Sequence, residues 1–231
     1  MADCDILMDH PDSPTFSLFG LELPARPTVV MVYATLALIA DHYYNFFENF
    51  FPIPTYADQL RYAAYDHLVI YGLIPVLMVI FLYRRPLAEF NLRLGDWRIG
   101  LRLTVLAWAI AAPILYIAGH APDVQSYYVR YFLGPFDVMF TAVVELVGWE
   151  FFFRGFLLIA LWEVAGPYAV VLQAVPFAMA HVTKPPAEAL STIFGGIAFG
   201  WVAWKTKSFL YPFLIHLFIA TFIVFVAVYL R

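Results

Sequence analysis

Residues 145–155 read ELVGWEFFFRG and lie inside an apolar run from about residue 135 to about residue 161. A run of this length can cross the hydrocarbon core of a bilayer, which is about 30 Å thick. Glu150 and Arg154 are four residues apart, so they share one helix face, with the acid on the N-terminal side that favours pairing. A charge at the centre of a membrane costs at least about 2.5–3.5 kcal/mol. The pair must therefore face protein or water, where its simplest role is to neutralise itself and lock helix packing.

The composition places nearly the whole chain in a membrane. Of the 231 residues, 63% are hydrophobic and 13% are charged, whereas soluble domains have about 25% charged residues. The mean hydropathy is +0.78. This composition predicts an all-α polytopic membrane protein with membrane lipid as its surroundings and no second soluble domain. The single Cys4 excludes an intrachain disulfide, and a net charge of −4 gives no indication of a nucleic-acid partner.

Hydropathy predicts a bundle of about seven transmembrane helices. The expected spans are residues 28–51, 63–83, 99–119, 135–161, 167–182, 189–204 and 209–230. Residues 1–27 carry five acids against Arg26 and lack the basic and apolar regions of a secretory signal, so we expect an acidic, partly disordered cytosolic tail before a bundle over residues 28–231. Arginines between residues 84 and 102, together with Lys205 and Lys207, fall on one side of the membrane. Because basic loops stay in the cytoplasm, we expect an integral protein of the bacterial inner membrane with a cytoplasmic N-terminus.

Further ionisable groups occur within or next to the predicted spans. His181 ends the segment FAMAH, Glu188 follows it beyond Pro185 and Pro186, and His216 lies inside the last span. A single membrane histidine is often only a hydrogen-bonded helix contact, and Glu188 just after a proline suits a helix N-terminus. Groups this costly in lipid should nevertheless meet in a shared cavity.

Such a cavity supports two kinds of chemistry. In the first, a Glu held by Arg or His takes a proton from water while a His stabilises the developing oxyanion. In the second, His181, His216 and the carboxylate of Glu188 bind a divalent metal such as zinc with an open position for water. The residues leave both possibilities open.

A second group of polar residues occurs near the predicted outer surface. Asp41, Asn45 and Glu48 share a helix face, and Asp66 and His67 are expected at a similar depth. They form either a second polar site or, more simply, a wetted interfacial face.

Three blocks of sequence resemble the CPBP family, the CAAX-protease and bacteriocin-processing group of intramembrane endopeptidases that includes Rce1-like proteases. The family pattern is Glu-Glu-x-x-x-Arg, then Phe-x-x-x-His, then His-x-x-x-Asn or Asp. The matching blocks here are residues 149–154 (WEFFFR), 177–181 (FAMAH) and 216–220 (HLFIA), within a core of residues 136–220. The resemblance implies an intramembrane hydrolase with Glu150, Arg154, His181 and His216 in its active site.

Two positions depart from the family pattern. The first Glu, which the resemblance implies would activate water, is Trp149, and the Asn or Asp that would help bind the oxyanion is Ala220. Glu188 is the expected replacement if the chain folds back at the two prolines. Glu145 is a weaker replacement because it lies about 140° around the helix from Glu150.

Three functions therefore remain as hypotheses. The first is a divergent endopeptidase in which Glu150 or Glu188 is the base, His181 orients water or binds metal, His216 stabilises the oxyanion and Arg154 holds Glu150 ionised. The second is a non-proteolytic binding, immunity or scaffold protein that holds a membrane-embedded peptide or a lipid. The third is a metal-dependent membrane enzyme acting on a lipid-soluble substrate.

Overall fold

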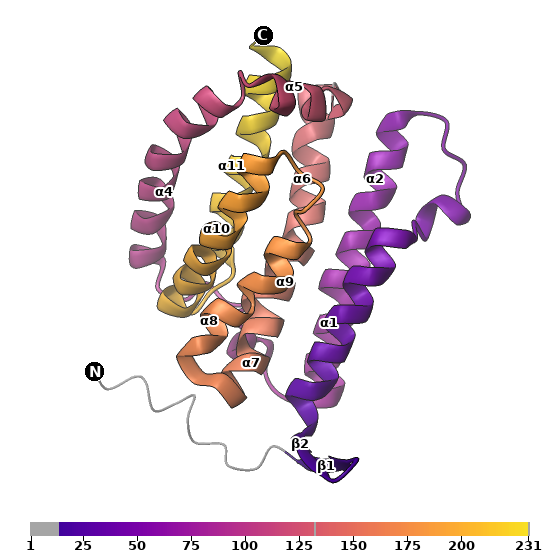
Figure 1. The fold of residues 1–231 in the computed structure, drawn as a ribbon, viewed down its shortest axis with the longest axis vertical. Coiled ribbons are helices and arrows are strands. Elements are labelled where there is room, and N and C mark those ends of the chain that lie inside the picture. The colour runs from indigo at the N-terminus through magenta and orange to yellow at the C-terminus, as the bar shows by residue number, and fades with distance from the viewer. Residues whose placement is uncertain (1–13, 132, 231) are drawn as a thin grey trace.

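The computed structural model describes residues 14–131 and 133–230, and most of these residues form a bundle of helices (Figure 1). The first long helices are α1 (Ala25–Tyr43) and α2 (Tyr56–His67), and α2 continues through η3 (Leu68–Leu73), α3 (Ile74–Met78) and η4 (Val79–Tyr83). Then follow α4 (Trp97–Ala118) and α6 (Pro135–Glu150), and α6 continues through η7 (Phe151–Leu157) and α7 (Leu158–Ala165). The last are α8 (Ala169–Leu172) with α9 (Ala174–Met179), α10 (Pro186–Thr206) and α11 (Leu210–Tyr229). Short helices lie between them: η2 (Phe47–Asn49), η5 (Leu87–Phe90), α5 (Pro122–Tyr128), η6 (Val129–Tyr131) and η8 (Gly166–Tyr168). The predicted all-α bundle of about seven helices is confirmed.

Five helical runs in the described residues are long and apolar enough to cross a membrane: Tyr56–Tyr83, Trp97–Ala118, Pro135–Met179, Pro186–Thr206 and Leu210–Tyr229. The run from Pro135 to Met179 contains two of the predicted spans. It reverses at Gly166, where φ is +53°, so that α6 and α7 run one way and α8 and α9 return (Figure 1). The chain is an integral membrane protein.

The first predicted span ends earlier than expected. α1 stops at Tyr43 because Tyr44 adopts an extended backbone, and η2 and an extended stretch lead from there to α2. A new helix starts at Tyr56, where the side chain of Thr55 accepts a hydrogen bond from the backbone N–H of Asp58. The residues between the two helices therefore form a connection and not the end of a span.

The predicted N-terminal tail is only partly described, since residues 1–13 lie outside the described residues. Beyond them, β1 (Thr15–Leu18) pairs with β2 (Leu21–Pro24) as an antiparallel hairpin. Phe19 and Gly20 form its turn with positive φ values of 51° and 82°. The placement of this segment in the cytosol stays a prediction.

The two basic loops of the bundle lie at one end of the molecule. The backbone N–H of Asp96, just before α4, donates to the carbonyl of Thr206 at the end of α10 over 2.8 Å. The Arg93 side chain donates to the carbonyl of Lys207 over 3.0 Å. The loops predicted to share one side of the membrane are thus in direct contact, and the cytoplasmic assignment of that side remains a prediction.

Close helix crossings at glycines position the site. A Cβ on Gly148 of α6 would lie 3.0 Å from the carbonyl oxygen of His67 and 3.2 Å from the backbone nitrogen of Gly72. A Cβ on Gly196 of α10 would lie 2.9 Å from the Cβ of Ala174 in α9. A larger residue at either position would require its neighbours to shift, and these close crossings bring α2 and α9 against the elements that carry the site residues.

Candidate functional site

The centre of the site is the carboxylate of Glu150, which is completely buried at the C-terminal end of α6. Its Oε1 lies 2.6 Å from Nδ1 of His216 on α11. Its Oε2 lies 3.2 Å from Nε of Arg154. One oxygen is therefore hydrogen-bonded to an imidazole, whereas the other lies within ion-pair distance of a guanidinium without a hydrogen bond.

Arg154 lies in η7, the π-helical continuation of α6, and is also completely buried. The carbon of its guanidinium lies 4.1 Å from the ring centre of Phe177 and 5.2 Å from that of Phe199. Aromatic faces attract a cation, so these rings and Glu150 together stabilise the buried charge. The expectation that this pair marks the bundle interior agrees with its complete burial.

His181 lies beside this pair, in the turn between α9 and α10. Its Nδ1 is 2.7 Å from the carbonyl oxygen of Phe177, and its ring centre is 6.3 Å from that of His216. A carbonyl only accepts hydrogen bonds, so Nδ1 carries the proton and Nε2 of the neutral ring keeps a lone pair. Burial and the nearby His216 lower the pKa of His181 to about 4. His181 is therefore neutral at pH 7.

Glu188 lies in a different set of contacts, at the start of α10. The hydroxyl of Tyr128 donates to its carboxylate over 2.7 and 2.8 Å, and Nζ of Lys184 lies 3.2 Å away. Burial and the Glu188 charge raise the pKa of Tyr128, so the phenol keeps the proton that it donates. The structure thus brings together Glu150, Arg154, His181 and His216, while Glu188 ties the turn after α9 to α5.

The expected metal ligands do not form a metal site. Among the described residues, no group of three or more His, Cys, Asp or Glu side chains is arranged to hold a metal ion. Nδ1 of His216 faces Glu150 and Nδ1 of His181 faces a carbonyl, which leaves Nε2 of each ring open, as in many metal-binding histidines. The expected third ligand, Glu188, is instead bound by Tyr128 and Lys184. His181, His216 and Glu188 therefore do not meet as the three ligands of one metal ion.

A second polar cluster lies between α1, α2 and α6. Nε2 of His67 is 2.7 Å from Oδ1 of Asp41, and its Nδ1 is 3.3 Å from Oε1 of Glu145. The sequence indicated a second polar site around Asp41 and His67 as one of two possibilities. Nothing in the sequence showed that α6 would supply Glu145 to it. Asp66 accepts from the backbone N–H of Phe47 instead, over 3.3 Å.

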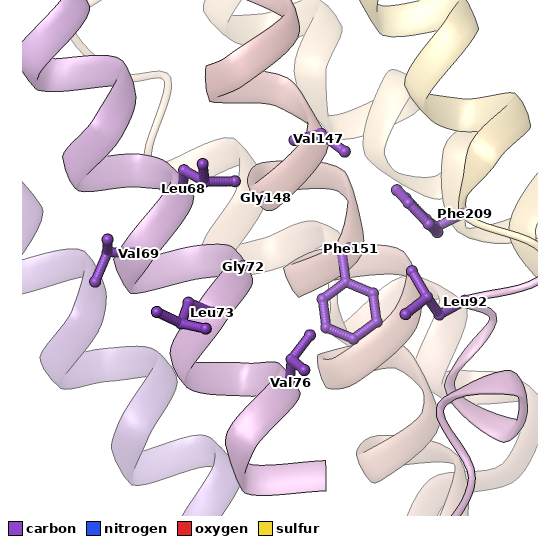
Figure 2. Close-up of a pocket in the computed structure, with 10 residues that line it drawn as sticks. All are labelled: Leu68, Val69, Gly72, Leu73, Val76, Leu92, Val147, Gly148, Phe151 and Phe209. Carbon is purple, nitrogen blue, oxygen red and sulfur yellow. The ribbon is translucent and has the colours of Figure 1, made fainter. Parts of the chain in front are cut away.

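An apolar cavity of about 390 Å³ opens on another side of α6 (Figure 2). It is lined by residues of η3 and α3, of α6 and η7, and of the loops before α4 and α11: Leu68, Val69, Gly72, Leu73, Val76, Leu92, Val147, Gly148, Phe151 and Phe209. Figure 2 shows Phe151, Val76 and Leu92 directed toward the same space. These linings suit a hydrocarbon chain and hold no group for acid–base chemistry.

Comparison with protein-family models gives a match over residues 131–222 to the family described as "Type II CAAX prenyl endopeptidase Rce1-like". The chain carries an Rce1-like domain. This domain spans α6 to most of α11 and contains Glu150, Arg154, His181 and His216. No curated protein and no solved structure matches the chain.

The match over residues 131–222 agrees with the resemblance to CPBP-type intramembrane proteases that the three sequence blocks indicated. The two departures from the family pattern are visible in the structure. Trp149 is 7% exposed, stacks with His67 and meets His181 edge-on, with ring centres 5.8 and 6.1 Å apart. Ala220 packs against the apolar core. An indole and a methyl group thus occupy the positions of two polar groups in the family pattern.

Proposed function

We propose that the protein is an intramembrane hydrolase, a divergent Rce1-like endopeptidase, in which Glu150 and His216 together activate water. The observation that carries the proposal is the 2.6 Å contact between a fully buried carboxylate and an imidazole, beside a second imidazole and inside the Rce1-like domain. A carboxylate on one ring nitrogen fixes the tautomer of a histidine and stabilises its protonated form, as in serine hydrolases.

The proposed reaction uses the free nitrogen of His216. Glu150 accepts from Nδ1–H of His216, so Nε2 takes a proton from water as the water oxygen bonds to the scissile carbonyl carbon. The imidazolium then gives this proton to the leaving amine as the C–N bond breaks. Glu150 is thereby a positioning group and not the base, because both of its oxygens are already engaged.

His181 orients the attacking water in this proposal. Its ring centre lies 6.3 Å from that of His216, and one water molecule with two hydrogen bonds of about 2.8 Å can bridge imidazoles at such a separation. Ala220 supplies no hydrogen bond to the oxyanion, and loss of one such donor costs about 10²–10³ in rate. We therefore expect slow turnover.

The substrate that fits these features is a membrane-embedded or lipid-modified peptide. The site lies among membrane-spanning helices, and the apolar cavity beside α6 has room for a hydrocarbon chain. We place the basic loops and the N-terminus on the cytoplasmic side of a bacterial inner membrane, because the two loops are in contact and carry the arginines and lysines.

The proposal is tested on the full-length protein in lipid nanodiscs. The probes are a prenylated peptide with a CAAX-type C-terminus and the same peptide without its lipid, with cleavage followed by mass spectrometry. We expect cleavage of the lipidated peptide, and a loss of about 10²–10⁴ in kcat for His216→Asn, the usual value of general acid–base catalysis. His120→Asn is the matched control, since this exposed imidazole contacts only its own helix turn at Tyr116 among the described residues.

Trp149 favours one other function, a membrane binding or scaffold protein without proteolysis. An aromatic wall improves a ligand pocket and does not activate water. Under this alternative, no probe peptide is cleaved, yet a fluorescent lipidated peptide binds equally well to the parent and to His216→Asn. Cleavage that is lost in His216→Asn and kept in His120→Asn excludes it.

A further inference from the structure

Three ionisable side chains from three helices meet at one point outside the Rce1-like blocks. His67 of α2 lies between Asp41 of α1 and Glu145 of α6, at 2.7 and 3.3 Å. The contact of Nδ1 with Glu145 is an ion-pair contact without a hydrogen bond, and both carboxylates attract the imidazole when it is protonated. The ion clamp (Asp41, His67 and Glu145) thus holds the imidazole from both sides.

The position of the ion clamp is set by the tight crossing of α2 and α6. Gly148 lies against the backbone of His67 and Gly72, so the two helices cross with little space for a side chain between them. This crossing places the ring of His67 on the indole of Trp149, with ring centres 5.8 Å apart and planes inclined by 28°. Tyr71, one turn after His67, meets the same indole edge-on at 4.8 Å. The indole is therefore held by two rings from α2.

Trp149 in turn contacts the proposed active site. Its ring centre is 6.1 Å from that of His181, at an angle of 69°, and 6.3 Å from that of Phe177. A continuous series of contacts thus runs from Asp41 through His67 and Trp149 to His181.

We propose that the ion clamp is a positioning device that holds Trp149 as an aromatic wall over His181, so that α1 and α2 control the water access and substrate fit of the site. Charged groups in the membrane-spanning region are costly, so their presence there indicates a function. A clamp across three helices fixes the orientation of a ring that has several rotamers available. Trp149, which stands where the family pattern has its first Glu, thereby forms a wall of the site and takes no part in the chemistry.

This inference deepens the proposed function, and its test has a readout that needs no enzymatic activity. Full-length protein in nanodiscs is treated with diethyl pyrocarbonate, and carbethoxylation of each histidine is measured by mass spectrometry. His181 is buried and is expected to react slowly in the parent protein, whereas exposed His120 serves as an internal reference. His67→Ala and Trp149→Ala should raise the ratio of His181 to His120 modification by about two- to twelve-fold, the value of one aromatic contact.

Two further variants keep the test decisive. Asp41→Asn removes one charge of the clamp with no change of size, so it covers the case in which His67→Ala does not fold. His42→Ala is the matched control, because His42 is exposed on the same helix as Asp41 and packs against Tyr43. We expect a raised modification ratio in Asp41→Asn and an unchanged one in His42→Ala.

Activity supplies the second readout. A wall acts on substrate fit, so Asp41→Asn should raise KM more than it lowers kcat, whereas loss of the base at His216 lowers kcat. An unchanged His181 ratio in folded His67→Ala and Asp41→Asn would overturn the inference, whatever their activity. Absence of all hydrolysis, with a raised His181 ratio in the variants, would instead reject the proposed function and still support the positioning of Trp149 by the ion clamp.

Discussion

The buried pair of Glu150 and Arg154 gives the sharpest prediction, because its two partners can be removed singly and together. Arg154→Met replaces the guanidinium by an apolar chain of similar length, and leaves a fully buried carboxylate with His216 as its remaining contact. Breaking a buried ion pair from one side costs about 3–5 kcal/mol. Glu150→Gln leaves the guanidinium buried without a counter-charge, and the faces of Phe177 and Phe199 compensate only in part.

The double variant should be far more stable than the sum of the single effects. Two independent losses would add to about 6–10 kcal/mol, whereas replacing a whole buried pair by uncharged groups is often neutral. The double variant Glu150→Gln, Arg154→Met should therefore unfold close to the parent protein. Unfolding is measured by circular dichroism in mixed micelles with a rising fraction of sodium dodecyl sulfate. Additive losses in this cycle would refute a direct pairing of the two groups.

The same double variant separates stability from catalysis. A Gln at position 150 cannot stabilise a protonated His216 as a carboxylate does, so the restored fold should remain inactive toward the lipidated peptide. Arg154→Met alone keeps the carboxylate on His216, and should retain measurable cleavage where the protein is folded. A fully active double variant would show that Glu150 has only a packing role.

Three other predictions concern the turn after α9 and its contact with α5. Tyr128→Phe removes both hydrogen bonds from the hydroxyl to Glu188 and leaves Lys184 as the ion-pair partner of that carboxylate. Hydrogen bonds to a charged group are worth about 1.5–3 kcal/mol, so the variant should lose about that much stability, measured by unfolding in mixed micelles. Glu188→Gln should keep peptide cleavage within a few-fold of the parent, and a complete loss of cleavage in this variant would restore this acid as the base. His181 has a pKa of about 4 in the folded protein and 6.5 as an ordinary histidine, so between these values the unfolded chain binds more protons than the folded one. The contribution of His181 to the free energy of unfolding should therefore fall as pH drops from 6.5 toward 4 and stay constant below. This contribution, measured in the same unfolding assay, should vanish in His181→Asn.

The meeting of Glu150, Arg154 and His216 could be predicted from the sequence, because it depends on helix geometry and on the cost of charge in lipid. Glu150 and Arg154 share a face by helix geometry alone, and their burial follows from the cost of charge in lipid. Their meeting with His216 followed from the same cost, together with the family blocks. The end of α1 at Tyr43 was not predicted, because a run of aromatic residues scores as apolar whether it is helical or a connection.

The partners of Glu188 and Glu145 could not be predicted for a different reason. Each depends on where a remote helix crosses, and periodicity within one helix carries no information about that. Glu188 was expected beside His181, but the hydroxyl of Tyr128 on α5 binds it. Glu145 points away from Glu150 and looked like a weak candidate, yet the crossing at Gly148 brings it to His67 of α2. Long-range packing decided both outcomes.

The replacement of the family's first Glu by Trp149 changes the electrostatics of the site in a consistent way. Two adjacent buried carboxylates repel each other, and one of them then needs a further cation or a proton. With an indole at position 149, the single carboxylate of Glu150 is matched by Arg154 on one oxygen and by His216 on the other. The proton-accepting role is thereby free to pass from a carboxylate to an imidazole, which at pH 7 is the better matched base. An aromatic residue at this position is thus compatible with hydrolysis, provided that His216 carries the proton and Glu150 only holds the ring.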